Sequence, residues 1–310
     1  MRIWPTLLLA ACAARPPPPP PAQIEVAVTV DDLPVHGSLP PGLTREQIAE
    51  RMLAAFRDHH LPPVYGFVNG KRTEELPEGE HILRRWVEAG HPLGNHTWSH
   101  ASLNDLPVEA WLADAVRNEP LLERLDRTGT WKMFRYPYLF EGDEPAKKAA
   151  ARASLRERGY AIAEVTIDAD DWLYNRAYVR CLTAGDAAAV EELRRAYVEA
   201  HLAELRYVQE ITRALAGRQI RHVLLQHIGA LDADRMGALL TAYEAAGVRW
   251  IDLPTALADP LYEMQQLRAI KAGASLPYLL LAGRDVRPPP RQAGSEDRLD
   301  QLCSAPPRPG

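Results

Sequence analysis

The sequence predicts an α/β protein built as an irregular (β/α) barrel with about seven parallel strands. Short segments rich in β-branched residues alternate along the chain with longer segments whose apolar residues recur at helical spacing. The stretch between the two proline-rich ends, residues 23–283, has about the length of one such barrel. A doubly wound open sheet is the competing fold. Neither G-x-G-x-x-G nor G-x-x-x-x-G-K-[ST] occurs, so nucleotide binding has no support in the sequence.

Local signals place each element in chain order. Residues 23–29 alternate and are rich in β-branched side chains, so they are expected to form the first strand. The first helix is expected over 43–60, where Thr44 and Gln47 have the spacing of a capping box. Further strands are expected at 63–68, 91–95, 131–135, 160–167, 221–226 and 248–251, and further helices at 80–88, 107–125, 145–158, 187–216 and 236–246. We interpret the unusually long helix at 187–216 as a scaffold, with a substrate-facing insertion as the alternative.

Composition restricts the class of protein. The chain has 310 residues, of which 46% are hydrophobic and 25% are charged, and these proportions are ordinary for a globular protein. Its formal net charge of −5 argues against a nucleic-acid partner, because nucleic-acid-binding domains usually present a basic surface. A monomer is expected. The 27 prolines are unevenly distributed, with an unbroken run at 16–21 and a second concentration after residue 287.

The two ends of the chain are expected to lie outside the catalytic domain at 23–283. Residues 1–12 combine a basic start with a short apolar stretch, as signal peptides do, and the sequence LAAC ending at Cys12 resembles a bacterial lipobox. We therefore expect an exported lipoprotein of the cell envelope that faces the periplasm and contacts the membrane only through a lipid on Cys12. Plain secretion is the alternative. Residues 13–22 are then a proline-rich linker, and residues 284–310 a disordered proline-rich tail.

Two further cysteines, Cys181 and Cys303, lie within the mature chain. In an oxidising compartment they can form a disulfide, but the sequence does not fix their separation, and two free thiols are the equal alternative. No C-x-x-C occurs, which excludes a zinc site built on such a thiolate pair.

Polar residues with catalytic chemistry gather at the expected strand ends, where parallel barrels carry their functional side chains. They are Asp31 and Asp32 after the first strand, His96 and His100 after the third, Arg135 to Tyr138 after the fourth, Asp168, Asp170, Asp171 and Trp172 after the fifth, and His227 after the sixth. This series predicts an active site at one end of the barrel.

Two histidines at the third strand end have the spacing of metal ligands. His96 and His100 are four residues apart, so in a helical turn both imidazoles lie on one face. Two solvated surface histidines are the alternative, but Asp32 can supply a third ligand, and two histidines with one carboxylate leave an open position for water. The neighbouring Asp31 is then available to accept a proton from that water. Turn capping is the alternative role of the two aspartates.

The motifs TVDD, HTWSH, RYPY, DADDW and LLQH occur in this order between residues 29 and 227. Together they resemble the five motifs of the polysaccharide deacetylase (NodB-like) family, carbohydrate esterase family four. The resemblance implies a NodB-like barrel and a hydrolase that acts on carbon–nitrogen bonds other than peptide bonds. It also implies a divalent metal, for which zinc is expected, with Asp32, His96 and His100 as its ligands.

The same resemblance implies roles for five further residues. Asp31 is similar to the catalytic base of the family, and His227 to the general acid that protonates the leaving group. Arg135 resembles the residue that orients the base, and Asp171 resembles the partner of Arg135 and of the acid histidine. The backbone N–H of Tyr138 would help to hold the oxyanion.

Residues around the motifs bear on the choice of substrate. Family members usually have glycine after the two aspartates, whereas Leu33 and Pro34 follow here, and His36 comes soon after. We interpret His36 as an ordinary loop histidine, with a place in the substrate groove as the alternative. Trp98 and Trp172 lie beside the motifs and are expected to line the groove, with core packing as the alternative.

The expected function is removal of acetyl groups from an N-acetylated polysaccharide in the cell envelope, a peptidoglycan or chitin-like glycan. One alternative is an esterase or amidase of the same fold that acts on acetylated xylan or on a non-carbohydrate amide. The other is an inactive glycan-binding lipoprotein, against which the complete set of five motifs argues. No organic cofactor is expected.

Overall fold

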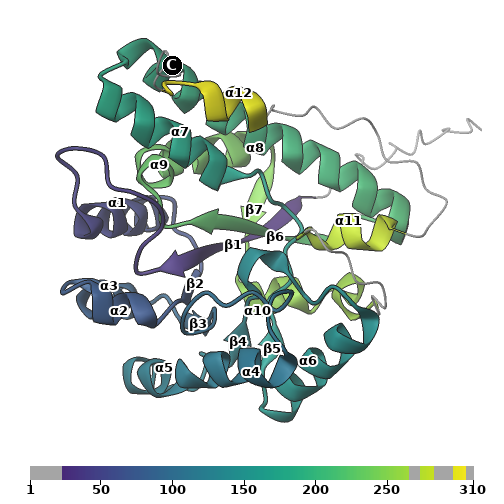
Figure 1. Ribbon diagram of the computed structural model, residues 1–310. Helices are drawn as coiled ribbons and strands as arrows, with labels where there is room; N and C mark the ends of the chain where they lie inside the picture. The colour runs from purple at the N-terminus through teal and green to yellow at the C-terminus, as the bar shows by residue number, and fades with distance from the viewer. Residues whose placement is uncertain (1–22, 265–272, 283–295, 305–310) are drawn as a thin grey trace, which may run out of the picture.

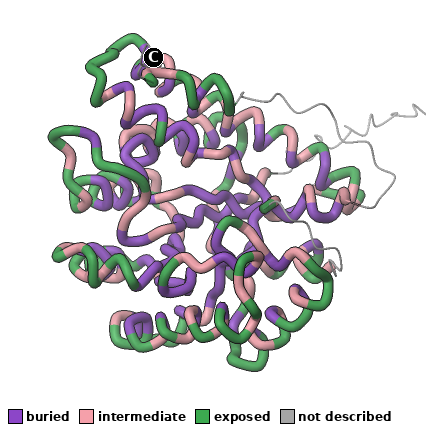
Figure 2. Tube along the Cα trace, in the orientation of Figure 1, coloured by how far each residue is buried: buried purple, intermediate pink, exposed green. Residues whose placement is uncertain are grey.

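The computed structural model describes residues 23–264, 273–282 and 296–304. Seven short strands form one parallel sheet at the centre of the molecule, and helices surround it (Figure 1). The strands are β1 (Ile24–Leu33), β2 (Tyr65–Val68), β3 (Leu93–Asn95), β4 (Met133–Phe134), β5 (Ala161–Ile162), β6 (Arg221–His227) and β7 (Val248–Trp250). Their residues are mostly buried, whereas the outer faces of the helices are exposed (Figure 2).

The strands lie in the order β5-β4-β3-β2-β1-β6, and β7 pairs with the first residues of β1. The sheet curls until its two outer strands approach each other. Beyond β5, Ile167 forms a parallel bridge to Leu224 of β6, and the N–H of Leu225 donates to the carbonyl of Ile167 at 3.0 Å. This curled parallel sheet confirms the predicted irregular barrel.

Helices cover the outside of the sheet. They are α1 (Arg45–Asp58), α2 (Lys71–Glu75), α3 (Gly79–Glu88), α4 (Val108–Arg117), α5 (Glu119–Leu125), η1 (Pro137–Leu139), α6 (Pro145–Glu157), α7 (Asp171–Ala184), α8 (Ala187–Ala216), α9 (Ala230–Ala245), α10 (Leu253–Leu257), η2 (Pro260–Glu263), α11 (Leu276–Leu281) and α12 (Glu296–Gln301). The capping box predicted for the first helix is present, since Thr44 and Gln47 exchange both of its hydrogen bonds.

Several elements differ from the sequence-based expectation, and the short helices α2, α10 and α11 were not predicted. The single helix expected at 107–125 is divided at Asn118, with Pro120 in the first turn of α5, because proline has no N–H to continue the helical ladder. The strand expected at 160–167 is reduced to β5 and the isolated bridge at its end. Helix α7 was not predicted, although its apolar residues and the left-handed Gly185 at its end are ordinary helix signals.

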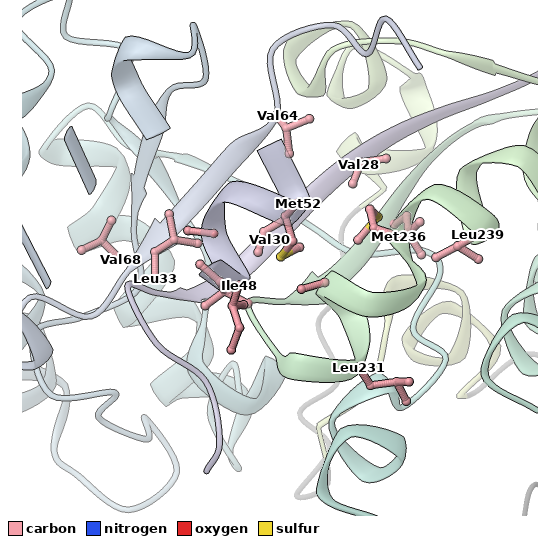
Figure 3. Packing of buried hydrophobic residues seen from close by; sticks show 14 of the residues in the cluster. Val28, Val30, Leu33, Ile48, Met52, Val64, Val68, Leu231, Met236 and Leu239 are labelled. Carbon is pink, nitrogen blue, oxygen red and sulfur yellow. The ribbon is translucent and has the colours of Figure 1, made fainter. Parts of the chain in front are cut away.

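The long strand β1 separates two apolar layers, because its side chains alternate between its two faces. Val28 and Val30 are buried in the outer layer together with Met52 of α1 and Met236 of α9 (Figure 3). A smaller cluster fills the barrel and contains Ala27, Tyr65, Phe67, Met133, Ala163, Val223, Ile251, Leu253 and Ala256. Side chains two residues apart share a face of a strand, so Thr29 and Asp31 point into the barrel interior as Ala27 does. They make the interior polar at the carboxyl end of β1.

The structure tests only part of what was expected at the chain ends. The signal peptide with its lipobox at Cys12 and the linker at 13–22 lie outside the described residues. Within the tail expected to be disordered, residues 296–304 instead form α12 and a turn that pack on α7. A disulfide joins Cys303 to Cys181 of α7, which resolves the alternative that the sequence left open. None of the described helices has both the length and the apolar character needed to cross a membrane.

We predict that Cys303→Ser lowers the free energy of unfolding by about 2–4 kcal/mol, because the cross-link closes a loop of the unfolded chain over 122 residues. Urea unfolding followed by circular dichroism measures the loss. Reduction should lower the stability of the wild-type protein by a similar amount and leave the variant unchanged. Equal midpoints for the oxidised wild type and the variant would contradict this account.

Candidate metal and catalytic site

The carboxyl ends of the strands bring the predicted site residues to one edge of the sheet. Asp31 lies near the end of β1, where the register of the sheet pairs it with His227, the last residue of β6. His96 follows β3 directly, and Arg135 follows β4. Parallel strands that end at the same edge therefore gather side chains that are up to 196 residues apart in the chain.

Arg135 lies inside the barrel and holds Asp31. Its side chain is fully buried, and Nη1 donates to both carboxylate oxygens of Asp31 at 3.0 and 3.1 Å. Its other donors are also satisfied, Nε by the carbonyl of Ala163 at 2.6 Å and Nη2 by the hydroxyl of Thr29 at 3.1 Å. The guanidinium lies over the Phe67 ring at 4.6 Å. A buried cation with all these partners fixes the carboxylate in one position.

Asp32 faces the two histidines of the HTWSH motif. Its Oδ1 lies 3.5 Å from Nε2 of His96 and 3.3 Å from Nε2 of His100. This oxygen is buried and has no hydrogen-bond partner among the described residues. Ligand atoms about 2.0–2.1 Å from one tetrahedral ion lie about 3.3 Å apart, so the spacing fits a shared metal better than it fits hydrogen bonds. The three residues could hold a divalent cation.

The two imidazoles are prepared to act as ligands. The Nδ1 of His96 lies 2.8 Å from the carbonyl of Arg135, so that Nδ1 carries the proton and the lone pair of Nε2 points toward Asp32. Burial lowers the pKa of His100 to about 4, which keeps its ring neutral at pH 7. Burial alone would raise the pKa of Asp32, but a hydrogen bond from His36 and the charges of nearby histidines hold it well below its usual value. The site therefore offers the Nε2 atoms of two imidazoles and one carboxylate.

The second half of the site is a histidine–carboxylate pair. Nδ1 of His227 donates to Oδ1 of Asp171 at 2.7 Å, and the backbone N–H of His227 donates to Oδ2 at 2.6 Å. Burial works against the charged ring, but the adjacent Asp171 carboxylate raises the pKa of His227 well above its usual value. The resemblance also implied a contact between Asp171 and Arg135. Within the described part of the chain the hydrogen bonds of that guanidinium go elsewhere, so this expectation is corrected.

Backbone strain marks the same site. Five residues other than glycine that lie in the motifs have a positive φ: Asp32 (65°), Thr97 (61°), His100 (60°), Tyr138 (59°) and Asp170 (55°). A left-handed conformation is unfavourable for side chains that carry a Cβ, and such residues cluster where function requires a particular direction. His60, Leu139 and Cys303 also have a positive φ outside the motifs, so left-handed backbone is concentrated at the candidate site but not confined to it.

The aromatic residues expected in the groove lie in different surroundings. Trp98 is only 8% exposed and packs in the outer apolar layer with Arg117 over its ring, so its expected place in a groove is corrected to core packing. Trp172 is partly buried against the same layer with Arg176 over its ring. Tyr138 is 55% exposed, and its ring lies edge-on to His100 at 4.3 Å. Tyr138 is therefore the aromatic side chain of the motifs that is most open to a substrate.

His36 is the site residue that the sequence interpretation missed. Nδ1 of His36 lies 2.7 Å from Oδ2 of Asp32, and its ring lies 4.4 Å from the ring of His227. The expectation of an ordinary loop histidine is therefore wrong. Its spacing of four residues from Asp32 was the available signal, but no regular element connects the two positions in the sequence pattern.

Comparisons with known proteins identify a family and a shared fold. Residues 19–158 match a family model described as polysaccharide deacetylase. A peptidoglycan-N-acetylglucosamine deacetylase of Bacillus cereus is 27% identical over 150 residues, which are 48% of this chain and 47% of that protein. The chain thus covers less than half the length of this curated relative.

Two solved structures share the fold. The chitin deacetylase of Colletotrichum lindemuthianum has a TM-score of 0.51 and 19% identity, and the match covers 81% of this chain and 95% of that one. A carbohydrate esterase family 4 (CE4) pseudoenzyme of Bacillus anthracis has a TM-score of 0.52 and 12% identity, with coverage of 76% and 66%. We conclude that residues 19–158 belong to the polysaccharide deacetylase family and that the described fold is the one found in these carbohydrate esterase family 4 structures.

Proposed function

We propose that the protein is a metal-dependent hydrolase that removes acetyl groups from an N-acetylated polysaccharide, a peptidoglycan or chitin-like glycan. The observation that carries this proposal is that three sets of oriented polar side chains meet at one edge of the barrel. These are the Asp32–His96–His100 cluster, the Arg135–Asp31 pair and the Asp171–His227 pair. Relatives named as peptidoglycan and chitin deacetylases support the choice of substrate class.

The unpartnered Oδ1 of Asp32 and the Nε2 atoms of His96 and His100 would hold the metal, for which zinc is the expected ion. A divalent ion bound there supplies Lewis acidity toward the acetyl carbonyl and lowers the pKa of water. The protein contributes fixed ligand directions, since the carbonyl of Arg135 sets the tautomer of His96.

Asp31 is suited to act as the general base. Arg135 keeps its carboxylate at the site, with one oxygen 3.9 Å from Nε2 of His96, so a water placed beside the metal ligands is within its reach. Asp31 takes the proton of this water as the water attacks the acetyl carbon. The backbone N–H of Tyr138, in its strained turn, is proposed to stabilise the oxyanion.

His227 is suited to act as the general acid. Asp171 accepts hydrogen bonds from both the ring and the backbone of His227, which keeps the ring protonated and fixed in orientation. The proton on Nε2 is then available to the amine nitrogen as the carbon–nitrogen bond breaks. Asp31 and His227, paired in the sheet register, thus divide the two proton transfers between them.

The proposed place of action is the cell envelope. The Cys181–Cys303 disulfide is typical of proteins outside the reducing cytoplasm. We propose export as a monomer, with a lipid on Cys12 as the only membrane contact and secretion as the alternative.

An inactive glycan-binding protein is the second candidate, because a pseudoenzyme shares this fold. The two candidates differ in acetate release, which we propose to measure with chitooligosaccharides, peptidoglycan, acetylated xylan and a small N-acetyl amide. The proposal requires release from a chitooligosaccharide or from peptidoglycan. Release from xylan or the small amide alone would favour the esterase or amidase alternative, and glycan binding without any release would favour the pseudoenzyme.

Removal of the metal or of one ligand should abolish activity. We predict that EDTA stops acetate release, that added Zn²⁺ restores it, and that His96→Ala no longer retains stoichiometric zinc, because two of the three ligands remain. Metal content after dialysis measures how much zinc His96→Ala retains. The exposed His81→Ala on α3 is the control and should retain its zinc. Full activity in EDTA would contradict the metal-dependent mechanism.

The two proton-transfer residues should be separable from metal binding. We predict that Asp31→Asn and His227→Ala each lower kcat by about 100-fold or more while zinc content stays at the wild-type level. Asp58→Asn, an exposed aspartate with a side chain 67% accessible, should leave kcat unchanged. Loss of zinc from Asp31→Asn would show instead that Asp31 is a ligand.

A further inference from the structure

We propose that His36 is a positioning residue of this site. Its ring N–H holds one oxygen of Asp32, so that the other oxygen is presented to the two ligand histidines. This inference rests on the metal-dependent function proposed above and concerns a residue outside the five motifs.

The two oxygens of Asp32 have different surroundings. Oδ2 lies 2.7 Å from Nδ1 of His36, which is the length of a charge-assisted hydrogen bond. Oδ1 lies 3.3 and 3.5 Å from the Nε2 atoms of His100 and His96, and it has no hydrogen-bond partner among the described residues. Because the carboxylate can rotate about its Cβ–Cγ bond, the bond from His36 to Oδ2 fixes the plane of the group and with it the direction in which Oδ1 points.

His36 is itself held in place. Its backbone carbonyl accepts a hydrogen bond from Nη1 of Arg45 at 3.0 Å, and the next carbonyl, that of Gly37, accepts one from Nη2 at 2.6 Å. Gly37 has φ of +63°, and a Cβ there would lie 2.9 Å from Nδ2 of Asn175, so glycine lets the loop take this conformation and pack closely against α7. The side chain of His36 is 17% exposed. A loop fixed at both its backbone and its ring can orient another residue.

The ring of His36 also connects the two halves of the site. It packs against the ring of His227 at 4.4 Å with a tilt of 36°. His36 therefore lies between the candidate acid and the candidate metal ligand, and it contacts both.

Direct metal binding by His36 fits the distances less well. Asp32, His36 and His227 do place one ligand atom each within 4.8 Å of one another. The atoms of His36 and Asp32 are 2.7 Å apart, however, which is shorter than the roughly 3.3 Å between two ligands of one tetrahedral ion. The contact is a hydrogen bond from a neighbouring residue to a ligand, and loss of such a partner typically weakens metal binding by about 10–100-fold.

The test measures zinc affinity of the apo-protein by competition with a chromogenic chelator. His36→Ala and His36→Phe both remove the N–H donor, and the second keeps a ring against His227. His36→Asn keeps an N–H close to the position of Nδ1. We expect the first two to bind zinc about 10–100-fold more weakly and His36→Asn to stay within a few-fold of the wild type. The control is His59→Ala, since His59 also contacts a carboxylate, Glu244 at 3.0 Å, with a side chain 18% exposed, but lies outside the site.

Three results would overturn the proposal. They are wild-type affinity in His36→Ala and His36→Phe, equal weakening in His36→Asn, and a changed cobalt absorption spectrum in His36→Phe, which would mean that a ligand had been lost. Urea midpoints of the apo-variants identify any general loss of folding. Wild-type protein that binds zinc but releases no acetate from any substrate would count against the deacetylase proposal while leaving the affinity comparison valid.

Discussion

The buried guanidinium of Arg135 is the constraint on which the rest of the site depends. A cation without water inside a barrel is strongly destabilising unless its nitrogens have hydrogen-bond partners, and here Asp31, Thr29 and the carbonyl of Ala163 accept hydrogen bonds from all three nitrogens. The same residue also acts through its backbone, since its carbonyl accepts the Nδ1 proton of His96. One residue after β4 therefore sets both the position of the candidate base and the direction of a candidate ligand. A change at Arg135 would disturb two functions at once and leave a buried carboxylate without its partner.

The other half of the site depends on a polar network behind it. Asp232 of α9 lies close to Asp171, and burial together with the Asp171 charge raises the pKa of Asp232 well above its usual value. A neutral Asp232 can donate to the Asp171 carboxylate, which in turn accepts from His227. The hydroxyl of Tyr197 lies 2.8 Å from Asp232 and 2.6 Å from Gln226. Tyr197 belongs to α8, which packs mainly on α7, α9 and α11 and reaches β6 through the hydrogen bond to Gln226, as expected of a scaffold helix.

The succession of strands and helices along the chain could be predicted from the sequence, as could the strand ends that carry the candidate site. Both depend on local signals: strand-forming segments, and polar residues where those segments end. Contacts that depend on three-dimensional register could not. Arg135 pairs with Asp31 and not Asp171, because its side chain crosses the barrel interior from the end of β4 to the end of β1. Trp98 packs inward because the left-handed Thr97 before it redirects the chain. His36 reaches the site through an irregular loop, and no periodicity describes the direction of a side chain there.

The conformation of the candidate site lowers the stability of the fold. Residues with left-handed backbone each cost of order 1–3 kcal/mol, and an unsatisfied buried carboxylate oxygen adds to that cost. The two apolar layers and the disulfide offset these terms from elsewhere in the molecule. A cation that binds Asp32 and its two histidines finds this arrangement only in the folded chain, so its binding free energy adds directly to folding stability. Ligand positioning and fold stability are therefore linked: residues that hold Asp32 in its strained conformation maintain the site before any ion arrives, and the ion then stabilises the conformation that they maintain.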